Sequence, residues 1–215
     1  MSTRPYVVRQ GDYTGRLAAR FGTDADTLWS DPQNRELADQ RPDRDVLAPG
    51  DILHVPERSP ATQALRPHRT NRYQATVPRT NLSLVMRSAG QPIRNERCAV
   101  HGITRDPIEA STDGDGRLAL QIPVHVGEIT VVIPGRNISC PVRIGHLDPL
   151  TEWSGIRSRL TQLGYLRRVG ADEGHEAPRP LVAVALRRFQ EDQGLPPTGE
   201  PDETTRDRLR RAHGS

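Results

Sequence analysis

The start of the chain alternates between short β-prone runs and stretches with the apolar spacing of helices. Residues 6–9 and 52–56 are the β-prone runs, and turn residues bound both of them. Between them, three apolar side chains fall on one face of a first helix: Leu17, Ala18 and Phe21. We expect Asp12 to cap the start of this helix and Gly22 to end it.

A second helix is predicted to follow directly. Thr23 and Asp26 have the spacing of a capping box, and Asp31-Pro32 stops the helix because proline cannot continue it. The polar residues 33–45 are expected to form a long, charged loop before the second β-prone run. The pattern therefore predicts a unit of the order strand, helix, helix, strand (βααβ) over residues 1–58.

The middle of the chain has the alternating pattern of short strands. Residues 59–73 are rich in Pro, Arg, Ser and Thr and are read as a linker. After them, the strand candidates are residues 82–86, 98–100, 118–122 and 129–133. Glycine-containing turns separate the candidates, so we predict a small β-sandwich over residues 74–147, similar to immunoglobulin-like or carboxypeptidase-regulatory-like domains.

Residues 148–215 return to helical spacing. The first apolar stripe is Ile156, Leu160 and Leu163, and the second is Val182, Ala185, Leu186 and Phe189. Gly164 is placed to end the first helix, whereas Asp202 is placed to cap a third helix that buries Leu209. The whole chain is therefore predicted to be a multidomain α+β protein that ends in a three-helix module.

Composition supports several small cores and argues against nucleic acid as a partner. Only 34% of the 215 residues are hydrophobic and 4% are aromatic, while 18 glycines and 19 prolines interrupt the chain. The formal net charge is +3, and all 30 basic residues are arginines, which bind phosphate well. Acidic residues are interspersed among them, and no basic tract carries the aromatics that stack on bases.

Motifs for catalysis or metal binding are missing from the sequence. It contains no HExxH, GxSxG or CxxC, and no histidine pair at helical ligand spacing. Cys98 and His101 lie on opposite faces of a predicted strand, so they form no catalytic pair. The turn at residues 113–116 lacks the remaining ligands of a calcium loop and is read as a hairpin. We expect no enzyme activity, no catalytic residue, no metal and no cofactor.

Cysteine content and apolar runs leave two further expectations. Cys98 and Cys140 are too few for a disulfide framework, and they either form one bridge or stay reduced. No stretch approaches the roughly 20 apolar residues of a membrane span, so no membrane insertion is expected. Residues 1–9 lack the apolar run of a signal peptide, so we expect synthesis in the cytoplasm.

Residues 5–56 resemble LysM domains. The motifs Tyr-Val-Val-x-Gln-Gly-Asp, Leu-Ala-x-Arg-Phe-Gly-Thr and Leu-x-Pro-Gly-Asp-x-Leu-x-Val-Pro occur in the order of that family. Tyr13-Thr14-Gly15 and the long second loop depart from its pattern. The resemblance implies a site for an N-acetylated sugar on two loops lying side by side, with Gly11, Asp12, Tyr13 and Thr14 in the first and Asp31, Pro32, Gln33 and Asn34 in the second. The alternative is that Gly11 and Asp12 only form a turn and a helix cap.

Residues 153–210 resemble the three-helix peptidoglycan-binding fold. They contain Ile-Arg-x-x-Leu-x-x-Leu-Gly-Tyr-Leu, followed by Ala-Leu-Arg-Arg-Phe-Gln-x-x-x-Gly-Leu-x-x-Thr-Gly-x-x-Asp-x-x-Thr-x-x-x-Leu. The segment 167–180 replaces the short turn that is usual between the first two helices. The resemblance implies a shallow groove for muropeptides lined by Gln162, Tyr165, Gln190, Thr198 and Asp202, although Tyr165 and Phe189 also suit the core.

Together these features predict a non-catalytic protein that binds peptidoglycan through both terminal modules and gains avidity from the pair. The order of modules also resembles accessory proteins of type VI secretion. The alternative is therefore a structural adaptor of a contractile injection system, with spike or baseplate proteins as partners and residues 35–45 as the docking surface. Delivery by such a machine to the periplasm or a target cell would explain export without a signal peptide.

Overall fold

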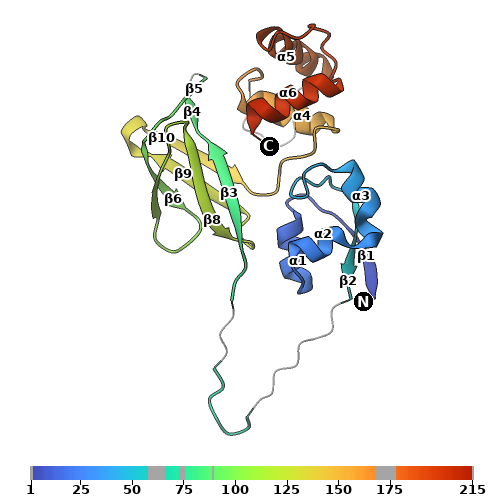
Figure 1. Cartoon of the computed structure of the whole chain (residues 1–215). Coiled ribbons are helices and arrows are strands. Elements are labelled where there is room, and N and C mark those ends of the chain that lie inside the picture. Colours follow the sequence, from blue (N-terminus) through green and yellow to red (C-terminus); the bar gives the residue numbers. More distant parts are fainter. Residues whose placement is uncertain (1, 58–65, 73–75, 89, 168–177, 215) are drawn as a thin grey trace.

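The computed structural model describes the chain except residues 1, 58–65, 73–75, 89, 168–177 and 215. Part of the expected linker, 59–65 and 73, therefore lies outside the described residues. Buried side chains gather in three hydrophobic clusters that follow one another along the chain, in an N-terminal unit, a β-domain and a C-terminal helical module (Figure 1). No described helix has the length and apolar content needed to cross a membrane.

In the N-terminal unit, the first and last elements along the chain are two paired antiparallel strands, and the helices lie between them in the sequence. Its elements are β1 (Thr3–Val7), α1 (Thr14–Phe21), α2 (Ala25–Ser30), the 3₁₀ helix η1 (Pro32–Asn34), α3 (Arg35–Gln40) and β2 (Ile52–Pro56). In the β1–β2 ladder, Tyr6 lies opposite Leu53. The apolar face predicted for the first helix is buried against this ladder, and Gly22 ends α1 in the left-handed conformation with φ +72°.

Three expectations for this unit were wrong in detail. The expected loop 33–45 contains η1 and α3, because residues 35–40 favour helix and Leu37 is buried at the start of the run. Asp12 does not cap α1, since its Oδ2 accepts hydrogen bonds from the Tyr6 hydroxyl and the Arg9 N–H. The cap of α2 is Asp24, one residue later than expected, which accepts from the Thr27 N–H.

The β-domain consists of small antiparallel sheets. Its elements are β3 (Arg79–Val85), β4 (Arg87–Ser88), β5 (Gln91–Pro92), β6 (Arg97–His101), β7 (Ile108–Ser111), β8 (Arg117–Pro123), β9 (Glu128–Ile133), the 3₁₀ helix η2 (Pro134–Arg136) and β10 (Ile138–Arg143). One sheet has the order β10-β9-β6-β7, and the pairs β3–β8 and β4–β5 complete the domain. Leu118 and Ile122 of β8 share a buried cluster with side chains of β6 and β9, so the β3–β8 pair packs on the four-stranded sheet.

The two cysteines are free thiols and do not form the bridge that the sequence left open. Cys98 lies on β6 and Cys140 on β10, and β9 pairs with both of these strands. Neighbouring strands are about 4.8 Å apart, so two steps exceed the roughly 7 Å between Cα atoms that a disulfide spans. Burial also raises the pKa of the Cys98 thiol.

The C-terminal module has three helices around one small core. They are α4 (Trp153–Gln162), α5 (Arg179–Asp192) and α6 (Glu203–His213). Ile156 and Leu160 of α4, the predicted stripe of α5 and Leu209 of α6 are buried together, and Leu163, directly after α4, is partly buried against them. Asp202 caps α6 by accepting from the Thr205 N–H at 2.7 Å, and Gly164 follows α4 with φ +89°, as predicted.

Candidate functional site

Gln190 is the centre of a hydrogen-bond network under the turn between α5 and α6. Its side chain is fully buried, and Nε2 lies 3.0 to 3.1 Å from Thr198 Oγ1, the Glu200 carbonyl and Thr205 Oγ1. Its Oε1 accepts from the Gly199 N–H at 2.8 Å. Because a buried amide has to be satisfied within the protein, Gln190 holds this turn in shape and does not present its amide to a ligand.

Thr198 and Asp202 lie on the exposed side of the same turn. The Thr198 hydroxyl also accepts from the Glu200 N–H, at 3.2 Å. Hydrogen bonds from Thr205 hold the pKa of the Asp202 carboxyl below its usual value, as expected of an ionised helix cap. These two exposed residues, held in place by buried Gln190, form one small surface that remains available to a ligand.

Tyr165 and Gln162 contact residues outside the Gln190 network. The Tyr165 ring meets Phe189 edge-on, with centroids 5.4 Å apart, and burial together with the Asp192 carboxylate raises its pKa. Gln162 Oε1 is hydrogen-bonded to the His213 ring at the end of α6. No hydrogen bond among the described residues joins this pair to the Gln190 network. The structure therefore divides the five predicted muropeptide residues into two groups.

The three-helix module is similar to a known family of domains. Residues 150–209 match the family model of a putative peptidoglycan binding domain. The match covers α4, α5 and most of α6, and it supports the peptidoglycan-binding module predicted from the sequence. It supports peptidoglycan as a partner of the chain. Comparisons with curated proteins and with solved structures gave no match.

The first predicted glycan loop, Gly11 to Thr14, is enclosed by the protein. Tyr13 is only 4% exposed and belongs to the buried cluster of the β-domain, where its hydroxyl donates to the Val124 carbonyl at 3.2 Å. Arg16 lies over the Tyr13 ring and donates to the carbonyls of Val124, at 3.0 Å, and Val126, at 2.7 Å. We call this packing of residues 10–16 on the β-domain the first-loop contact.

In the first-loop contact, the backbone at Gly145 lies close to the backbone at Gly11. A Cβ atom on Gly145 would lie 2.6 Å from the Gly11 carbonyl oxygen, so only glycine fits there. The Gln10 side chain reaches Asp148 at 3.4 Å on the same side. Thr14 is fully buried, and its hydroxyl donates to the Arg44 carbonyl. The loop that was expected to meet a sugar therefore meets the β-domain and its own unit, and its glycan contact stays a prediction.

The second predicted glycan loop has two exposed and two structural residues. Asp31 accepts from the Gln33 N–H, and Asn34 is 1% exposed, with its amide bonded to the Leu28 and His54 backbone. Pro32 and Gln33 are exposed, and the Gln33 side chain contacts Thr3 at the start of β1.

The two loops make their contacts at different positions along the β1–β2 ladder. The second loop contacts β1 at Thr3 and β2 at His54, toward one end of the ladder. The first loop follows the other end, where Val7 pairs with Ile52. Glycan binding by either loop, and a site shared between them, stay predictions.

Arg41 was expected only as part of the docking surface 35–45 of the alternative function, and not as a contact within the chain. It forms a two-pronged pair with Asp51, with Nη2–Oδ1 at 2.7 Å and Nε–Oδ2 at 3.0 Å, and Nη1 donates to Thr151 Oγ1. The Asp51 carboxylate raises the pKa of Arg41. Because Thr151 lies just before α4, this arginine connects the N-terminal unit to the C-terminal module. The sequence signal for such contacts was weak: Arg41 lies in an expected loop, and only Tyr13-Thr14-Gly15 stood out from the LysM pattern.

The remaining candidates for metal binding or catalysis are the acidic turn 113–116 and the pair Cys98 and His101. The described residues contain no cluster of three or more His, Cys, Asp or Glu side chains able to hold a metal ion. The segment 113–116 forms the turn between β7 and β8, in which the Asp113 carboxylate accepts from the N–H groups of Asp115 and Arg117. Cys98 is buried and His101 exposed, in agreement with opposite faces of β6.

Proposed function

We propose that the chain is a non-catalytic peptidoglycan-binding protein in which the C-terminal module makes the main contact with the wall. The observation that carries this proposal is the match of residues 150–209 to the family of putative peptidoglycan binding domains. The folded three-helix core and the exposed Thr198 and Asp202 at its α5–α6 turn support it.

The N-terminal unit adds a second, weaker wall contact in this proposal. Among the predicted glycan residues only Pro32 and Gln33 are exposed, because the first loop is enclosed by the β-domain. Two weak sites on one chain raise the apparent affinity for a polymer that repeats its sites. The β-domain, on which Arg16 and Tyr13 pack, then holds the N-terminal unit in place beside the C-terminal module.

Co-sedimentation with purified sacculi tests the proposal. The full chain is expected to pellet with sacculi and to release no soluble muropeptides over hours. Failure to pellet would overturn wall binding, and release of muropeptides would overturn the non-catalytic part. Replacing both Pro32 and Gln33 by Ala should lower retention, whereas Gln91→Ala, an exposed change in the β-domain, serves as the matched control.

The second candidate, an adaptor of a contractile injection system, rests on the order of the modules. In that case the chain would ignore sacculi and co-purify with spike or baseplate proteins, and the machine would deliver it to the periplasm or a target cell. The segment 35–45, its expected docking surface, already uses Arg41 in contacts within the chain. We therefore rank this function second.

A further inference from the structure

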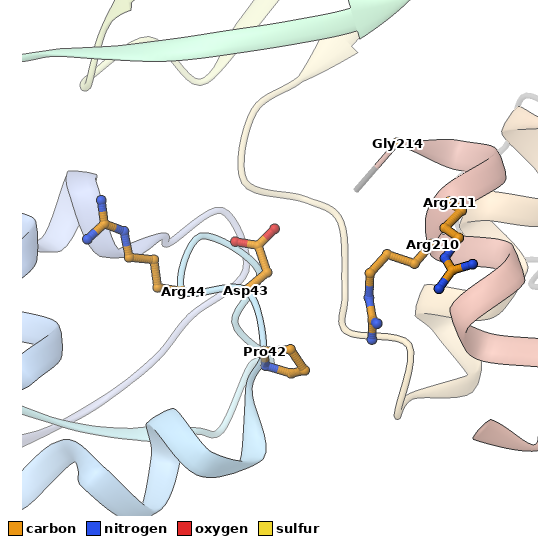
Figure 2. A pocket seen from close by; sticks show the side chains of 6 residues that line it. All are labelled: Pro42, Asp43, Arg44, Arg210, Arg211 and Gly214. Atoms are coloured by element: carbon orange, nitrogen blue, oxygen red, sulfur yellow. The ribbon is translucent and has the colours of Figure 1, made fainter. Parts of the chain in front are cut away.

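A hollow of about 570 Å³ lies between the N-terminal unit and the end of α6. Its lining residues are Pro42, Asp43, Arg44, Arg210, Arg211 and Gly214. Figure 2 shows the Arg210 side chain extending from α6 toward the loop after α3 that carries Pro42 and Asp43. The volume falls within the range of about 300 to 1,000 Å³ that is typical of small-ligand sites.

Contacts on both sides hold the two walls of the hollow in place. Arg41, two residues before Asp43, is bonded to Thr151, just before α4. The other wall is the end of α6, where the His213 ring is hydrogen-bonded to Gln162 Oε1 of α4. The hollow is therefore bounded by anchored backbone on each side.

Two of the charges that line the hollow have no ionic partner. Arg44 pairs with Asp26, and Arg210 pairs with Asp207 at 2.7 Å. The Arg211 side chain is exposed and forms no hydrogen bond or ion pair within the described part of the chain. Asp43 bonds only to a backbone group, accepting from the Asp45 N–H at 2.9 Å, so its charge is also not neutralised by an ion pair among the described residues.

Positive charge accumulates around the end of α6. Burial and the nearby Arg210 lower the pKa of Arg159 to about 10, and its buried Nε has no hydrogen-bond partner within the described chain. Burial, Arg159 and Arg87 lower the pKa of His213 to about 4. Burial is the larger cause of both shifts, and the arginines that add to it are the positive charges to which an anion entering the hollow would be attracted.

We propose that this hollow binds a short peptide bearing both carboxylate and ammonium groups, with a carboxylate on Arg211 and Arg210 and an ammonium on Asp43. Guanidinium groups pair with carboxylates, and the aspartate disfavours ligands that carry only negative charge, such as phosphate. The inference rests on the proposed function, because the stem peptide of peptidoglycan carries both kinds of group. It assigns the stem peptide, and not the glycan, to the junction between the two terminal units.

Titration of the full chain with a synthetic stem peptide, followed by calorimetry or NMR, tests this site. Arg211→Gln and Asp43→Asn should each weaken binding by roughly threefold to tenfold, the range between exposed and well-formed charged pairs. Arg188→Gln removes the same charge from an exposed position on α5 and should leave the affinity unchanged. All three side chains are exposed, so the variants are expected to fold normally.

A peptide with amidated carboxylates makes the test specific to the carboxylate contact. Amidation should weaken binding to the wild-type chain but have little further effect on Arg211→Gln, because the partner has already been removed. If Arg211→Gln and Asp43→Asn bind the free peptide as Arg188→Gln does, the hollow is not the site.

The two proposals fail in different measurements. If the chain still pellets with sacculi but Arg211→Gln does not change the affinity for the peptide, only the proposal for the hollow is overturned. A chain that does not pellet with sacculi overturns the proposed function, whereas the peptide titration still decides whether the hollow binds its ligand.

Discussion

Single side chains in this protein carry roles that depend on their surroundings more than on their type. Gln190 matched a wall-binding motif in the sequence, yet it is fully buried and holds a turn. Tyr13 lies in the N-terminal unit, yet its ring belongs to the core of the β-domain. The spacing of residues in the sequence indicates that such side chains have a role. It does not show which distant residues they contact, and these contacts decide the role.

Phe189→Ala should destabilise the C-terminal module by roughly 3 to 5 kcal/mol, as truncation of buried aromatics does. The side chain is fully buried and loses its edge contact with Tyr165 as well. Chemical denaturation measures the free energy of unfolding, with the exposed change Arg188→Ala as the control. An unchanged midpoint would mean that Phe189 is not in the core.

The stability of the same module should fall as the pH is lowered from about 6.5 to about 4, through His213. Its pKa is lowered from 6.5 to about 4 in the folded chain, so the unfolded chain binds the proton first. The stabilising contribution is present above the unfolded pKa and is lost as the pH falls toward the folded value. Thermal melting from pH 7 to pH 4 measures it, and His213→Gln should flatten that part of the profile. An equally steep profile in the variant would assign the effect to other groups.

At the scale of elements, the sequence predicted those whose signals are local. The stripes of α4 and α5, the cap of α6 and the left-handed Gly22 all follow from spacing or from one residue type, and the structure confirms them. The helix α3 was missed because its six residues contain a single buried apolar side chain, Leu37, which is too little for a periodic pattern. The strand order could not be predicted either, because β9 pairs with β6 as well as with its chain neighbour β10, and β7 and β8 separate β6 from β9 in the sequence.

Asp202→Ala should cost the module about 1 kcal/mol, because the first turn of α6 loses its cap on the Thr205 N–H. Asp202→Asn retains an acceptor and should recover most of this loss. Guanidinium denaturation of both variants provides the measurement. Equal destabilisation by Ala and Asn would show that the charge, and not the hydrogen bond, stabilises the helix.

At the scale of the whole molecule, contacts between units were the part that the sequence did not predict. The sequence predicted three units and a linker at 59–73, and it indicated no contact between the units. The structure instead packs residues 10–16 on the β-domain and bonds Arg41 to Thr151. These contacts join residues more than 100 positions apart, so no local pattern contains them. In hindsight, the bulky Tyr13 at a departure from the LysM pattern was the one local sign that this loop is covered.

Arg16→Ala should loosen the N-terminal unit from the β-domain without unfolding either. The side chain bonds two β-domain carbonyls and lies over Tyr13, while the hydrophobic cluster of its own unit does not include it. Hydrogen exchange in the full chain is expected to speed up at residues 10–16, because this loop would then meet solvent. The exposed change Arg35→Ala on α3 is the control. If exchange in the loop is the same in both variants, the first-loop contact does not protect this loop in solution, and the glycan role predicted for Gly11 to Thr14 becomes testable on the open surface.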